Sequence, residues 1–122
     1  MREDDDVTQD LRAVVLALIA AYDAGVVPER AEAKAAVKAT LAQLVEVAPG
    51  RAVEVRVPPF AAVQAVGGTT HRRGTPPAVV ECDARTWLAL ASGVLAWDDA
   101  VADGRLRASG ERSDLSEHLP LC

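Results

Sequence analysis

The sequence of 122 residues predicts a single α+β domain, with two leading helices in residues 1–49 and a sheet with its covering helices in residues 50–122. Apolar residues recur at helical spacing in the first part, and the period changes to two after residue 51. Half of the residues are hydrophobic, which is enough to bury a core. Only 3% are aromatic, so that core must consist mainly of alanine, valine and leucine.

Two amphipathic helices are expected first. The first ends at Gly25, with Asp6 and Gln9 as a capping-box pair, and the second opens at Pro28 and ends at Pro49 and Gly50. The apolar stripe of the first helix consists of Val7, Leu11, Val14, Val15, Leu18, Ile19 and Tyr22. The stripe of the second consists of Val37, Leu41, Leu44, Val45 and Ala48, opposite the solvent-facing Glu29, Arg30, Glu32, Lys34 and Lys38.

Three strands should follow. Alternation in residues 51–57 places Val53, Val55 and Val57 on one face of a strand. Two prolines then interrupt the hydrogen-bond ladder, because proline has no backbone N–H to donate. Residues 60–66 and 78–82 are the next two strands, and residues 67–77 form a polar loop between them.

The last third alternates short helices with a fourth strand. Asp83 can cap a helix over residues 84–92 that stops at Gly93, and Asp98 with Asp99 suits the first turn of a second helix. Gly104 stops that helix, residues 105–109 alternate as a strand, and a short helix begins near residue 114. The fourth strand follows a helical crossover, which allows it to pair in parallel with an earlier strand.

Charge and cysteine content exclude several classes of protein. Thirteen basic against eighteen acidic residues give a net charge of −5, which disfavours a nucleic-acid partner. Cys82 and Cys122 form no CxxC pair, so we expect a reducing cytoplasm and no disulfide framework. The apolar run 13–22 is shorter than the ~20 residues of a membrane span, and acidic residues precede it where a signal peptide is basic.

Few residues suggest catalysis. His71 and His118 lie far apart in sequence, so we expect no metal site. Cys82 is the one thiol to weigh as a nucleophile, but we favour its interpretation as a small buried hydrophobe. No phosphate-binding or dinucleotide-binding motif follows a strand, so no cofactor is expected. The sequence therefore predicts a protein that is not an enzyme.

One compact basic cluster occurs in this acidic chain. His71, Arg72 and Arg73, together with Arg56, could contact a carboxylate or phosphate head group, since arginine binds such groups in bidentate fashion. The alternative, which we favour, is a solvated loop tip.

The only two tryptophans, Trp87 and Trp97, lie on either side of Gly93. Both rings could face one apolar space between helix and sheet, or they could be ordinary anchors of a packed core. We favour core anchors, and a cavity is the competing interpretation only because the surrounding residues are so small.

These residues also resemble a known family. The segment "TWLALASGVLAWDDAVADGRLRASG", residues 86–110, resembles the hallmark of the sterol carrier protein type 2 superfamily: W-x-x-L-x-x-G, then D-A, then G-R-[LV]-x-x-x-G. The segments "EVRVPPFAAVQAV", "HRRGTPPAVVE" and "SDLSEHLPL" look like its small stand-alone bacterial branch. The resemblance covers residues 50–122.

The resemblance implies a sterol-carrier-like fold, with a mixed, mostly antiparallel sheet of about five strands covered on one face by helices. A short fifth strand would lie within residues 67–74. The resemblance also implies an apolar cavity for a lipid. By motif, its lining would be Trp87, Leu90, Leu95, Trp97, Val101, Leu106, Leu115 and Leu119.

Two functions follow as hypotheses. The first is non-catalytic binding or transfer of an apolar ligand, such as a lipid, sterol, fatty acid or acyl-CoA. The alternative is a protein-interaction module with the same fold and a filled core. A small enzyme that uses Cys82 or His71 is the weakest hypothesis.

Overall fold

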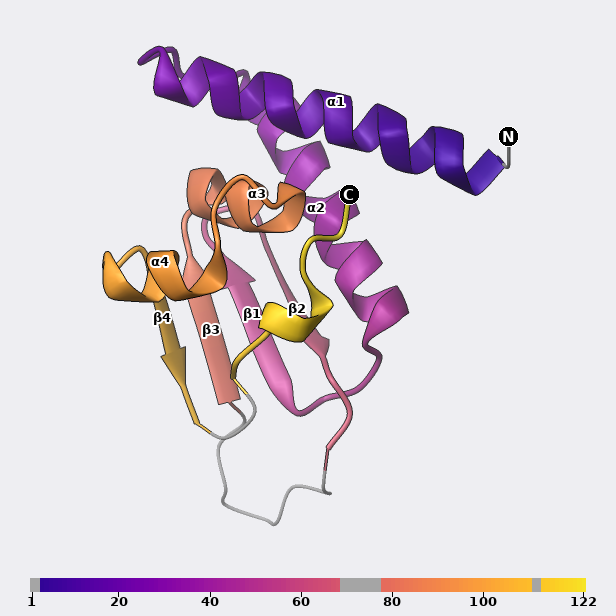
Figure 1. Ribbon diagram of the computed structural model, residues 1–122, viewed down its shortest axis with the longest axis vertical. Helices are drawn as coiled ribbons and strands as arrows, with labels where there is room; N and C mark the ends of the chain where they lie inside the picture. The colour runs from indigo at the N-terminus through magenta and orange to yellow at the C-terminus, as the bar shows by residue number, and fades with distance from the viewer. Residues whose placement is uncertain (1–2, 69–77, 111–112) are drawn as a thin grey trace.

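The computed structural model describes residues 3–68, 78–110 and 113–122, with side chains from residue 9 onward, and shows the expected α+β architecture (Figure 1). Its elements in chain order are α1 (Glu3–Asp23), α2 (Arg30–Val47), β1 (Val53–Val57), β2 (Ala61–Ala65), β3 (Ala78–Cys82), α3 (Ala84–Ser92), α4 (Trp97–Ala102), β4 (Leu106–Ser109) and a 3₁₀ turn (Ser116–His118).

The described residues form one four-stranded mixed sheet in the order β2-β1-β3-β4. The outer pairs, β1 with β2 and β3 with β4, are antiparallel, and the central pair β1 with β3 is parallel. The parallel pairing considered for the fourth strand is not observed, since β4 pairs with β3 in antiparallel orientation. The chain leaves β3, passes through α3 and α4, and returns along β3 in the opposite direction. Most of the segment expected to hold a fifth strand, residues 69–74, lies outside the described residues.

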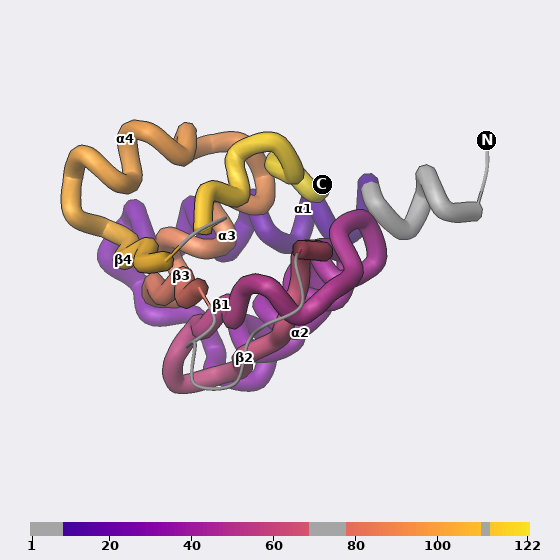
Figure 2. Tube along the Cα trace, turned by 90° about the horizontal axis from the view of Figure 1, so that it is seen from below, coloured from indigo at the N-terminus to yellow at the C-terminus, as the bar shows by residue number. Residues whose placement is uncertain are grey.

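The sheet buries one face. Val53, Val55 and Val57 of β1 are fully buried, as expected from their alternation, and so is Val80 of β3. The opposite face carries charged side chains, and its register places Arg56 beside Glu81 and Glu81 beside Arg107. Figure 2 shows the helices gathered on one side of the sheet, which is the side of the buried valines.

Local signals explain both ends of α3 and the start of α4. The Asp83 carboxylate accepts a hydrogen bond of 2.8 Å from the Thr86 N–H, and Gly93 ends α3 in the left-handed conformation at φ 80°. Asp98 and Asp99 lie in the first turn of α4, as predicted. The buried residues of α2 include the predicted Val37, Leu41 and Leu44.

Two predicted helix starts are wrong. α1 begins at Glu3, so Asp6 lies inside the helix instead of at its cap. α2 begins at Arg30 with Glu29 at the N-cap, two residues beyond Pro28. The first helix can begin before its predicted cap at Asp6 because aspartate within a helix is only mildly unfavourable.

Gly50 joins the end of α2 to the end of β2. The Val66 N–H donates to the Ala48 carbonyl at 2.6 Å, and the Ala52 N–H donates to the Val66 carbonyl at 2.9 Å. Gly50 has φ 146°, and a Cβ placed there would lie 2.2 Å from the Val66 carbonyl oxygen. Only glycine allows this close approach of two backbone segments.

We therefore expect Gly50→Ala to destabilise the fold more than Gly104→Ala, as measured by urea denaturation. Gly104 also has a positive φ, of 70°, but a Cβ added there would meet no atom within 4 Å, so it serves as the control for backbone conformation alone. Left-handed strain should lower the free energy of unfolding by about 1–2 kcal/mol at Gly104. Equal losses in the two variants would contradict the close approach at Val66.

Candidate functional site

Trp87 lies at the centre of the core and is fully buried. Its indole N–H donates a hydrogen bond of 2.8 Å to Thr40 Oγ1 of α2, and the Thr40 hydroxyl donates to the Ala36 carbonyl at 2.8 Å. Both polar groups are buried and both have partners, as a stable interior requires. The ring thus connects α3 to α2.

The other residues of the expected cavity lining surround the same core. Leu90, Trp97, Leu106 and Leu115 are buried, and Leu95 and Leu119 are partly buried against them. Val101 differs, because its side chain is 48% exposed on the outer side of α4. None of the eight lines either of the two surface pockets described below, and a ligand cavity among them stays a prediction.

The expected head-group cluster is only partly described. Arg56 is exposed, and its Nε lies 2.8 Å from Glu54 Oε1, so its charge is already paired. The hydrogen bond from Arg56 lowers the pKa of Glu54. Arg56 lines a shallow pocket of about 330 Å³ beside Pro58, Pro59 and Phe60. His71, Arg72 and Arg73 lie outside the described residues.

Nucleophilic and metal chemistry find little support among the described residues. Cys82 is buried, and burial together with the charges of Asp83 and Glu81 raises its pKa to about 12. His118 lies on the C-terminal 3₁₀ turn with Nε2 3.4 Å from the Glu117 carboxylate. In this part of the chain no three histidine, cysteine or acidic side chains converge as a metal site would need.

An apolar groove with a volume of about 630 Å³ lies between α1 and α2. Its α1 wall consists of Leu11, Val14, Ala17, Leu18 and Ala21, and its other wall of Pro28, Glu32, Ala35, Ala36 and Ala39. Alanines opposite larger side chains leave this space open. The volume falls within the range of about 300–1,000 Å³ that is typical of small-molecule sites.

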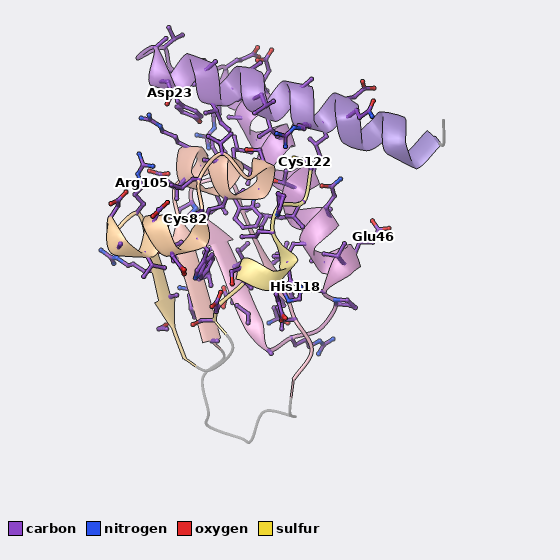
Figure 3. All side chains as sticks on the ribbon, viewed as in Figure 1. Asp23, Glu46, Cys82, Arg105, His118 and Cys122 are labelled. Atoms are coloured by element: carbon purple, nitrogen blue, oxygen red, sulfur yellow. The ribbon has the colours of Figure 1, made fainter. Side chains whose placement is uncertain are left out.

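Polar contacts hold α1 against α3, at the end of the molecule (Figure 1). Arg12 Nη1 donates to the carbonyls of Ser92 and Cys122, each at 2.7 Å. Farther along α1 lies Asp23 (labelled in Figure 3), whose Oδ1 is 2.5 Å from Arg85 Nη2 of α3. These contacts tie α1 to α3, and two of the three alanines of α2 that line the groove, Ala35 and Ala39, remain exposed.

The C-terminal segment completes this junction. The Leu121 N–H donates to the Ala91 carbonyl at 2.7 Å, and Cys122 receives the second bond from Arg12. The last carbonyls of α3 thus obtain hydrogen-bond partners from α1 and from the chain end.

The groove was not predicted from the sequence. Val14 was expected in the core stripe of α1, yet it is 49% exposed as part of the groove wall. The available signal was the row of alanines at positions 35, 36 and 39, which widens the apolar face of α2 beyond its core stripe. Alanine is also a strong helix former, so this signal alone does not distinguish a groove from a plain helix surface.

Thr40→Val should lower the free energy of unfolding by about 1–3 kcal/mol, because it leaves the buried indole N–H of Trp87 without an acceptor. In a Trp87→Phe background there is no indole N–H to lose its acceptor, so Thr40→Val should lower the free energy of unfolding by less. A double-mutant cycle by urea denaturation measures the difference. An equal cost in both backgrounds would show that the hydrogen bond contributes nothing to stability.

Cys122 should react with iodoacetamide before Cys82 does. A pKa of about 12 leaves about one Cys82 thiol in ten thousand ionised at pH 8, and the side chain is buried. Cys122 is only half-buried. Mass spectrometry of the native protein should find the label on Cys122, and labelling of Cys82 at a comparable rate would revive the nucleophile hypothesis.

Comparison with known proteins agrees with this architecture. Residues 29–121 match the model of a family described as "Bacterial SCP ortholog". No curated protein matched the chain. The SCP family is generally one of non-enzymatic carriers, which suggests a lipid-binding carrier role. The match covers every element from α2 onward, and by it the chain belongs to the bacterial SCP ortholog family of sterol carrier proteins.

Proposed function

We propose that the protein binds an apolar ligand without catalysis, in the groove between α1 and α2. The observation that carries this proposal is the groove itself, in which nine of the ten lining residues have apolar side chains. The ligand class is the one expected from the sequence: a lipid, sterol, fatty acid or acyl-CoA. The two unpaired cysteines support the cytoplasm as the location.

The burial of the tryptophans supports the groove as the binding site. Trp87 is fully buried, and Trp97 is 8% exposed. A ligand between the two rings would have to separate them from the core, whereas a ligand in the groove would cover exposed side chains such as Val14, Ala35 and Ala39. The groove therefore offers a binding mode that leaves the core packed.

The expected affinity is modest. Each buried methylene contributes about 0.8 kcal/mol, so a ten-carbon chain gains about 8 kcal/mol when fully buried. Association costs at least about 4 kcal/mol, so the net gain is at most about 4 kcal/mol and the dissociation constant is about 1 mM at its tightest. Longer chains should bind more tightly, with low selectivity among them.

Filling the groove should weaken binding. Ala39→Trp places a large ring in the groove, whereas the matched control Ala42→Trp adds the same ring at an exposed alanine of α2 that does not line it. We expect Ala39→Trp to weaken binding of 1-decanol at least tenfold, and Ala42→Trp to leave it unchanged, in NMR titrations of isotope-labelled protein.

Two outcomes would count against this site. Equal effects of the two variants would place decanol elsewhere, and chemical-shift changes confined to residues near Trp87 and Trp97 would favour the cavity among those residues. Urea midpoints of both variants close to that of the parent would confirm that the substitutions leave the fold intact.

A protein-interaction module is the second candidate. Apolar side chains are exposed at Val14 and Leu16 of α1 and at Val26 and Val27 just after it, where Val27 is 88% exposed. Such exposed apolar surface can bind another protein. A photo-crosslinker at Val14 would separate the candidates: adducts with one protein would favour this module, and adducts with lipid alone would favour the carrier.

A further inference from the structure

We infer that the groove between α1 and α2 favours a ligand with a cationic head group, such as an ammonium, over one with a carboxylate or phosphate. This inference rests on the proposed function, because it concerns the same groove. It also differs from the sequence-based expectation of an anionic head group at the basic cluster.

Among the residues that the structure describes, Glu32 is the only ionisable one that lines the groove. It lies in the first turn of α2 and is exposed. A ligand carboxylate would be attracted to the amino end of a helix, but there the Glu32 carboxylate already supplies the negative charge. A second anion would meet repulsion at the same place.

The neighbouring end of α1 is also negative. Ala21, in the last turn of α1, lines the groove, and that turn contains no basic residue. The carboxyl end of a helix carries a partial negative charge that favours cations. Asp23 lies in the same turn, but its charge is paired with Arg85, which leaves Glu32 as the carboxylate that a ligand would meet.

The described cations of α1 and α2 do not offset this charge. None of the four lines the groove. Arg12 is bound to the carbonyls of Ser92 and Cys122, and Arg30 stacks 5.2 Å from the centre of the Phe60 ring. The other two, Lys34 and Lys38, are exposed on α2 outside the groove lining.

Three ten-carbon probes that differ only in the head group test this inference: decylammonium, 1-decanol and decanoate, each titrated by NMR at pH 7 below its aggregation limit. We expect decylammonium to bind about twofold to thirtyfold more tightly than decanoate, with decanol between them, as weak exposed charge interactions predict. Added salt should reduce the preference, because it screens exposed charges.

Glu32→Gln should remove most of the preference for decylammonium. The matched control is Glu29→Gln, which removes the same charge one turn earlier at a residue that does not line the groove, and it should retain most of the preference. Both side chains are exposed, so both variants should fold, and urea midpoints check this.

The outcomes separate the two proposals. Binding of all three probes with equal affinity, or a preference for decanoate, would overturn the head-group inference and leave the apolar groove standing. Equal loss of the preference in both variants would assign it to net charge and would also overturn the inference. No binding of any probe would overturn the proposed function.

Discussion

The hydrogen bond between Trp87 and Thr40 is the interaction on which the rest of the architecture depends. Trp87 is the largest fully buried side chain, and its N–H would be costly to bury without a partner. Thr40 supplies that partner at 2.8 Å from the middle of α2. Because α3 follows β3 directly, this one contact sets α2, α3 and the buried face of the sheet against each other.

The position of α2 in turn determines what α1 can cover. One side of α2 faces the core through Val37, Leu41 and Leu44, whereas Ala35 and Ala39 are exposed on the groove side. α1 is held by polar contacts to α3 and to Cys122, and it buries Val15, Leu18 and Ile19 in the core. The groove lies where α1 and α2 meet without fully covering each other's apolar side chains. The family match begins at residue 29, so one wall of the groove comes from outside the matched region.

Local chemistry explains which elements could be predicted from sequence. The helix after Asp83 was predicted with its observed bounds, because its cap and its glycine stop are side-chain and backbone effects within a few residues. Alternation around Val55 likewise predicted both the strand and its buried face. The start of α1 was predicted wrongly, since a capping signal indicates where a helix can begin but does not prevent it from beginning earlier.

The sequence by itself determined the class, the order and most bounds of the elements, and many of the core residues, because these depend on periodicity and caps that act over short distances. The family could also be identified from the motif around Trp87 and Trp97. Only the tertiary structure decided the parallel pairing of β1 with β3, the partner of the Trp87 indole and the location of the groove. These features depend on how segments distant in the sequence meet. The sequence of a row of alanines is the same whether a neighbouring helix covers it or leaves it exposed.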